Sequence, residues 1–242
     1  MSALSPASRF IRGLEDMIQH ALSSEAFKQQ LRDSLRRETR GSRAIKIAKH
    51  ANIYNCGEKG ATVYVIESGQ VKLVTVSPDG KECLLAIYTG GDVFGEMCIA
   101  GSGERLETAT AMETTELKII PCSKLFARLT NDSLLEGFTR YLAARIADQT
   151  RIISNLVTVD CEHRLGTVLL QLAARLGNRD PGSVRIEKRI SHQELSAMVG
   201  TTRPRITEFM QRFRELGLVE NSAERFLVVK EKKLTAYLAQ TA

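Results

Sequence analysis

The stretch "ISHQELSAMVGTTRPRITEFMQRFRELGLVE", residues 190–220, decides how the fold of this chain is interpreted. Ser191 followed three residues later by Glu194 forms a capping box, which predicts the start of a short helix. Gly200 suits the left-handed residue that ends such a helix. The two threonines that follow offer an N-cap for a second helix, and Pro204 is tolerated in its first turn. Two helices joined by a short glycine-containing turn make a helix-turn-helix.

The second helix of this motif has an apolar stripe and a charged, exposed first half. The stripe is formed by Ile206, Phe209, Met210, Phe213 and Leu216. Gly217 ends the helix, and "RFLVVKEKK", residues 225–233, supplies a strand of a β wing. The exposed half of such a helix enters the major groove of DNA, where Arg203 can bind guanine and Glu208 can accept from cytosine. We therefore expect DNA contacts from Thr201, Thr202, Arg203, Arg205, Thr207, Glu208, Arg212 and Arg214.

A long helix is predicted earlier in the chain, before the stretch "ARLGNRDPGSVRI" (residues 174–186), whose Gly, Asn and Asp-Pro predict a loop. The helical segment is "SLLEGFTRYLAARIADQTRIISNLVTVD", residues 133–160, and it contains no proline. Leu135 and Leu142 begin a seven-residue repeat that continues through Gln149 and Leu156. Such a repeat fits either a core helix lying on the preceding domain or a two-chain coiled-coil seam. The seam assigns a dimer interface to Leu135, Phe138, Leu142, Gln149, Ile152 and Leu156, with Arg145 between them.

Residues 44–122 carry the pattern of a small β domain. Nine of the 17 glycines lie between positions 57 and 103, and short runs such as "TVYVIESG" separate them. "PDGK", residues 78–81, predicts a hairpin turn. This spacing predicts a compact antiparallel barrel or roll. Residues 8–38 have apolar side chains at helical spacing and predict an amphipathic helix.

The fold class is therefore α+β, with four segments. These are an N-terminal helical extension (1–43), a β-roll (44–130), a dimerisation helix (131–158) and a winged helix-turn-helix domain (159–242).

Charge, apolar runs, and the positions of histidine and cysteine limit the classes of function that the sequence supports. The formal charge of +6 and the pI of about 9.1 are consistent with an anionic partner. The start of the chain does not resemble a signal peptide, and no apolar run approaches the ~20 residues of a membrane span, so we expect a cytoplasmic protein without membrane contact. The four histidines lie near no nucleophile in sequence, so no catalytic residue and no enzyme are expected. The cysteines have no metal-ligand spacing, so no metal is expected; they are Cys56, Cys83, Cys98, Cys122 and Cys161.

A glycine-rich stretch, "VFGEMCIAGSGERLETATA" (residues 93–111), places Glu96 nine positions before Arg105. Together with the "D-x-x-x-R-L" of residues 160–165 and the helix-turn-helix, it gives a chain that resembles the CRP/FNR superfamily. These are the catabolite activator protein-like transcription regulators. The resemblance covers about residues 45–235.

The resemblance implies that the roll binds a cyclic mononucleotide, cAMP or cGMP. Arg105 matches the phosphate-binding arginine, and Glu96 matches the acidic residue that accepts from the ribose. The implied ligand-binding residues are Gly95, Glu96, Met97, Arg105, Leu106, Gln149 and Thr150. Leu106 departs from the family, which usually has Ser or Thr there. An alternative is that Glu96 and Arg105 pair with each other and hold an empty roll together.

The implied function is a homodimeric regulator that binds a palindromic site on double-stranded DNA. Ligand binding near Gln149 and Thr150 would change the dimer seam and rotate the two recognition helices, and RNA polymerase is a further expected partner. In this chain Pro204 and Glu208 replace the family's Glu and later Arg, so a different operator is expected. Two alternatives stay open. In the first, the regulator is ligand-independent, or it senses another small molecule or a redox signal, for which Cys98 is the relevant residue. In the second, the protein is a cyclic-nucleotide-binding module that acts on a protein partner.

Overall fold

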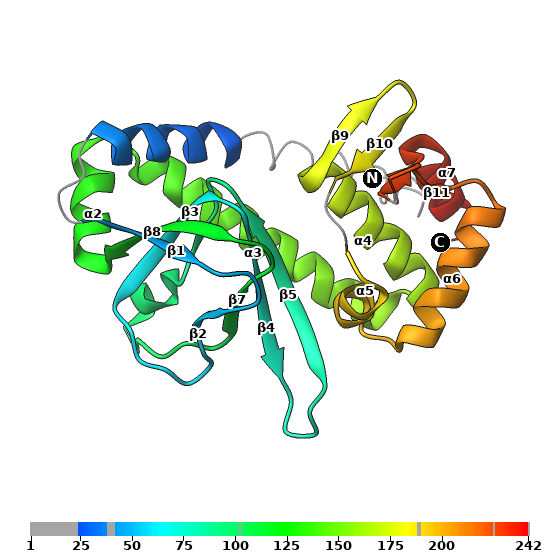
Figure 1. Cartoon of the computed structure of the whole chain (residues 1–242), viewed down its shortest axis with the longest axis horizontal. Coiled ribbons are helices and arrows are strands. Elements are labelled where there is room, and N and C mark those ends of the chain that lie inside the picture. Colours follow the sequence, from blue (N-terminus) through cyan, green and yellow to red (C-terminus); the bar gives the residue numbers. More distant parts are fainter. Residues whose placement is uncertain (1–23, 38–41, 102, 188–189, 225, 242) are drawn as a thin grey trace, which may run out of the picture. The chain divides into compact units, whose positions relative to one another are not determined.

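The computed structural model describes residues 24–37, 42–101, 103–187, 190–224 and 226–241 (Figure 1). These residues form two compact units, divided between Ala143 and Ala144. In the described part of the chain, no helix combines the length and the apolar character needed to span a membrane.

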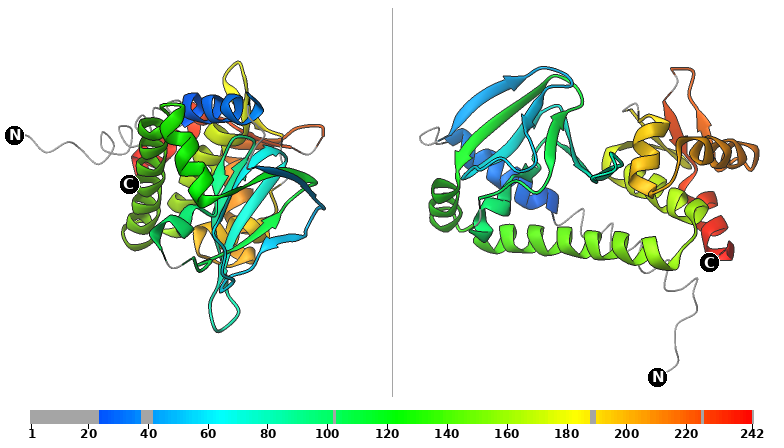
Figure 2. Two further views of the ribbon diagram at one scale, coloured as in Figure 1. Left: turned by 90° about the vertical axis from the view of Figure 1, so that its left-hand side faces the viewer. Right: turned by 90° about the horizontal axis from the view of Figure 1, so that it is seen from below.

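The first unit contains the predicted β-roll, made of two four-stranded antiparallel sheets (Figure 2). One sheet has the order β1 (Arg43–Ile47), β8 (Thr115–Pro121), β3 (Thr62–Ser68), β6 (Val93–Phe94). The other has the order β2 (Asn52–Tyr54), β7 (Thr108–Ala111), β4 (Gln70–Val76), β5 (Glu82–Thr89). The predicted turn joins β4 to β5, with Gly80 at φ 80°. The antiparallel roll predicted from glycine spacing is confirmed.

Aromatic side chains occupy the interior of the roll. Tyr64 and Phe94 stack with their ring centroids 5.0 Å apart, and Tyr54 and Tyr88 are buried beside Phe94. This cluster also contains Ile66, Val71 and Leu117, so the two sheets share one apolar core.

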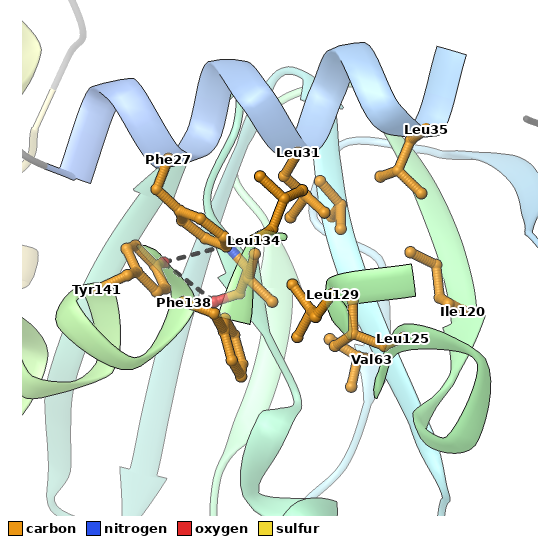
Figure 3. Close-up of a cluster of buried hydrophobic side chains, with 12 residues drawn as sticks. Phe27, Leu31, Leu35, Val63, Ile120, Leu125, Leu129, Leu134, Phe138 and Tyr141 are labelled. Atoms are coloured by element: carbon orange, nitrogen blue, oxygen red, sulfur yellow. Dashed lines mark hydrogen bonds between the residues drawn. The ribbon is translucent and has the colours of Figure 1, made fainter. Parts of the chain in front are cut away.

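A helix over residues 24–37 covers the outside of the roll. Its residues Phe27, Leu31 and Leu35 recur every four positions and are almost fully buried. They point toward strand residues Val63 and Ile120 and toward helix α2 (Cys122–Asn131), as Figure 3 shows. The predicted N-terminal helix is thus present from residue 24 and belongs to the body of this unit, while positions 8–23 of that prediction lie outside the described residues.

Helix α3 (Leu135–Thr158) is continuous, and its first turns belong to the same core. The ring of Phe138 is 3% exposed and lies 5.7 Å from the ring of Phe27. Phe138 was expected at the dimer seam, but its side chain is buried against its own roll, and the seam itself stays a prediction. The exposed aliphatic residues of α3 are Leu135, Ile146, Ile153, Leu156 and Val157.

The second unit contains the winged helix-turn-helix. Its helices are α4 (Cys161–Leu176), α5 (His192–Val199), α6 (Arg203–Glu215) and α7 (Glu231–Thr241). Its sheet has the order β11 (Val219–Asn221), β12 (Leu227–Val229), β10 (Ser183–Ile186), β9 (Gly177–Asp180).

Two local predictions in this unit are wrong. Residues 174–186 form the end of α4 and a β9–β10 hairpin rather than a loop, because Val184 pairs with Val229 of the wing. The segment expected as a wing strand is a strand only over Leu227–Val229, and α7 begins at Glu231. Helix α7 packs on α4, where a side chain at Gly166 would overlap Leu238.

Candidate ligand site and DNA-binding surface

The ligand loop of the roll is a single 3-10 turn held between two glycines. This turn, η1 (Glu96–Ala100), is flanked by Gly95 at φ 78° and Gly101 at φ 99°. A Cβ on Gly95 would lie 2.7 Å from Arg105 Nη1, which is closer than atoms can approach. Gly95 is therefore required for backbone conformation and for the close approach of the arginine.

Arg105 is buried beneath this loop, with 3% of its surface exposed. Nη1 donates to the carbonyl oxygen of Gly95 and Nη2 to that of Thr62, each at 2.7 Å. The guanidinium also lies 4.5 Å from the ring centroid of Tyr54, in a cation–π contact. Neutral carbonyls and an aromatic face thus solvate this buried cation within its own chain.

A buried polar pair lies beside the arginine. The hydroxyl of Tyr54 donates to Glu107 Oε1 at 2.7 Å, and both side chains are buried. Burial, followed by the hydrogen bond to Glu107, raises the pKa of Tyr54 far above its ordinary value. Sequence reasoning missed both residues. The signal that could have found Glu107 is the alternation of buried and exposed positions along this segment. Arg105, Glu107 and Ala109 are buried, whereas Leu106 is 55% exposed.

The structure brings together only part of the expected ligand set. Gly95 and Arg105 are in contact, and Glu96 and Met97 follow directly on η1. Gln149 and Thr150 lie on the part of α3 that belongs to the second unit, where both are exposed. Thr150 Oγ1 donates to the carbonyl of Ile146 within the helix.

The helix-turn-helix has the predicted ends. Ser191 N donates to Glu194 Oε2 at 2.8 Å, and Ser191 Oγ accepts from Glu194 N at 3.2 Å, so the capping box is formed. Gly200 ends α5 at φ 71°, and Pro204 lies in the first turn of α6. Thr202 occupies the N-cap of α6, but its side chain makes no capping hydrogen bond.

The polar residues expected to contact DNA lie on two flanks of α6. Arg203, Arg205, Thr207, Glu208 and Arg212 are all exposed. On one flank, Thr207 Oγ1 is 2.9 Å from His192 Nδ1. On the other, Arg212 pairs with Glu162 at 3.1 Å, and Arg205 Nη1 lies 3.8 Å from Cys161 Sγ.

His192 is a residue of this surface that sequence reasoning did not select. Burial, together with the nearby charges of Arg214 and then Arg203, lowers the pKa of His192. These three basic residues therefore lie close together at the start of α5 and along α6.

The "D-x-x-x-R-L" segment links the start of helix α4 to the end of helix α5. Asp160 is the N-cap of α4 and accepts from His163 N at 2.9 Å. Arg164 donates to the carbonyl of Val159 and, at 2.9 Å, to that of Val199 at the end of α5. The motif positions the helix-turn-helix against α4 rather than binding a ligand. Within the described residues, no three His, Cys, Asp or Glu side chains form a group able to hold a metal ion.

Comparison with known proteins agrees with this architecture. Residues 44–132 match the cyclic nucleotide-binding domain, and residues 163–237 match the Crp-like helix-turn-helix domain. A CRP-like cAMP-activated global transcriptional regulator of Mycobacterium tuberculosis is 27% identical over 199 residues, which cover 81% of this chain and 88% of the relative.

Two solved structures show the same fold. A CooA variant from Carboxydothermus hydrogenoformans has a TM-score of 0.70 at 24% identity, covering 82% of this chain and 88% of its own. The c-di-GMP responsive global regulator CLP of Xanthomonas campestris has a TM-score of 0.69 at 23% identity, covering 81% and 98%. Both domain matches, in this order along one polypeptide, show that the chain belongs to the CRP/FNR superfamily of transcription regulators, which are not enzymes.

Proposed function

We propose that this protein is a homodimeric, cytoplasmic regulator that binds a palindromic DNA site under the control of a small ligand held at Arg105. A cyclic nucleotide, cAMP or cGMP, is the first candidate ligand. The observation that carries this proposal is the buried Arg105 guanidinium beneath the glycine-flanked η1 loop.

The chemistry of Arg105 favours a phosphodiester anion. Its two shortest hydrogen bonds go to neutral carbonyls, at Gly95 and Thr62. Charge-assisted bonds from a guanidinium to phosphate are stronger than bonds to neutral acceptors. A cyclic phosphate can therefore replace the carbonyl of Gly95, and the movement of η1 that this requires takes place at Gly95 and Gly101.

The names of relatives and structural neighbours point to different ligands. The Mycobacterium tuberculosis protein is named as cAMP-activated, and the Xanthomonas campestris protein as c-di-GMP responsive. Glu96, which follows Gly95 on η1, is proposed to accept from a ribose hydroxyl.

The direct test is isothermal titration calorimetry of the full chain with cAMP, cGMP and c-di-GMP. We expect one of them to bind with a stoichiometry of about one per subunit. If none binds at millimolar concentration, the roll senses a different signal or is structural, and the regulator acts without a nucleotide.

DNA binding is proposed to use the exposed first half of α6, with Arg203 reading a base. RNA polymerase is a further proposed partner of the DNA-bound dimer. Retention on a DNA column with a steep dependence on salt concentration tests DNA binding separately from ligand binding.

A further inference from the structure

Two cysteine thiols meet at the edge of the ligand site. Cys98 lies in the middle of η1, and Cys122 is the first residue of α2. Cys122 N donates to the carbonyl of Ala61 at 2.8 Å, while Cys98 Sγ lies 3.9 Å from the carbonyl of Thr62. Because Ala61 and Thr62 are consecutive, both cysteines are anchored at the same point beside β3.

Further contacts keep the two thiols together. Helix α2 packs against η1, and Cys98 adds to the core cluster that contains Leu125 and Leu129 of α2. The Cys122 thiol is close enough to Cys98 to raise the pKa of Cys98, after burial. Both cysteines are half-buried, whereas Cys56 and Cys83 are exposed.

We propose that Cys98 and Cys122 form a reversible disulfide within one subunit when the protein meets a peroxide. The thiolate of Cys122 attacks hydrogen peroxide, which breaks the O–O bond, releases hydroxide and leaves a sulfenic acid on Cys122. Cys98 then loses its proton and attacks the Cys122 sulfur as a thiolate, and the hydroxyl leaves as water with that proton. The two thiols lose two electrons in total, and the peroxide is reduced to two waters.

The surroundings of Cys98 make the second step slow at neutral pH. Burial, followed by the nearby Cys122 thiol, raises the pKa of Cys98 to about 11. Since a thiolate is the attacking species, disulfide closure becomes faster as the pH rises toward that value.

The bond would change the ligand site directly. Thr62 O accepts from Arg105 Nη2 at 2.7 Å and also lies against Cys98 Sγ, so the thiols and the arginine share one carbonyl. A disulfide fixes η1 against α2 and opposes the hinge movement at Gly95 and Gly101. This consequence rests on the proposed function, and it predicts loss of cyclic-nucleotide binding in the oxidised protein.

The test uses the full chain in which Cys56, Cys83 and Cys161 are replaced by Ser, so that only the pair remains. The protein is treated with hydrogen peroxide, denatured, alkylated and mapped by mass spectrometry. We expect loss of both alkylatable thiols, a linked peptide pair containing Cys98 and Cys122, and full reversal by dithiothreitol. In the matched Cys98→Ser variant, Cys122 should stop at a sulfenic acid that dimedone traps.

The proposal is overturned if both thiols remain alkylatable after peroxide, or if each is oxidised separately without a linked peptide. The proposal is also overturned if the linked peptides come from two different subunits. Mixing isotope-labelled with unlabelled protein reveals such links between subunits. Because this readout needs no ligand, it is independent of the effector. A disulfide that forms in a protein that binds no nucleotide supports the dithiol site and refutes only the proposed effector.

Discussion

Arg105 has a role in the fold as well as the proposed role in ligand binding. Its guanidinium satisfies the carbonyls of Gly95 and Thr62 inside the roll. An Arg105→Ala substitution would remove the short hydrogen bond to each carbonyl and leave only the long contacts from Cys98, at a cost of up to about 1–3 kcal/mol for each buried group. Loss of ligand binding in that variant would therefore be mixed with loss of stability, and a neighbouring exposed position gives a cleaner test.

Leu106 is that position, because it is 55% exposed and stands where the family usually has a hydroxyl. We expect Leu106→Ser to strengthen cyclic-nucleotide binding by about 1 kcal/mol, or roughly fivefold in Kd, through one added hydrogen bond to the phosphate. Calorimetry measures the change. The control is Leu106→Ala, which removes the apolar side chain without adding a donor. An equal gain in both variants would show that relief of bulk, and not the hydroxyl, is responsible.

At the scale of single elements, we propose that the start of α6 reads a base and that a residue further along the helix contacts phosphate. Arg203 lies in the first turn of the helix, whereas Arg212 lies more than two turns later and pairs with Glu162. We expect Arg203→Ala to cost about 1–3 kcal/mol and to relax the preference for one base pair in each half-site. Arg212→Ala should weaken all sequences about equally. A binding-site selection with both variants distinguishes these effects, and the reverse pattern would place the other end of α6 in the groove.

The helix over residues 24–37 makes a different prediction, about stability. The ring of Phe27 lies 5.4 Å from that of Tyr141, and Lys28 forms a buried ion pair with Asp92 at 3.0 Å. Phe27→Ala should destabilise the protein by about 3–5 kcal/mol in urea unfolding, because it removes a fully packed ring. Phe126→Ala is the matched control, since that ring is 39% exposed and should cost much less. Similar losses would mean that the helix is only loosely attached.

Sequence reasoning succeeded for elements whose signals are local. The capping box at Ser191 and the glycine at position 200 are close in sequence, and they mark the start and the end of the first helix of the helix-turn-helix. It failed where strand formation depends on distant pairing, as in β10, whose Val184 pairs with Val229. The acceptors of Arg105 could not be predicted for the same reason, since Thr62 lies far from it in sequence.

At the scale of the whole molecule, the residues of the proposed dimer seam depend on which side α3 turns to a second subunit. The seven-residue repeat through Leu135, Leu142, Gln149 and Leu156 fits two different companion series. One runs through Phe138 and Ile152 and the other, one residue later, through Ile146 and Ile153. Each residue turns a helix by about 100°, so the two series face different sides. Phe138 is buried in its own subunit, whereas Ile146 and Ile153 are 63% and 64% exposed. We therefore propose the second series for the seam.

Ile153→Asp tests this seam and its role in DNA binding together. A charge placed in an apolar seam has no partner there, so we expect monomers at concentrations where the unmodified protein is a dimer in sedimentation velocity. Val76→Asp is the matched control, because it places the same charge at an aliphatic residue of strand β4 that is 55% exposed. Affinity for a palindromic site should fall steeply in the Ile153 variant alone, since a dimer holds its second helix-turn-helix near the second half-site at high effective concentration. Binding to an isolated half-site should be nearly unchanged. A dimer that persists in Ile153→Asp would show that the exposed aliphatic side of α3 is not where the two subunits meet.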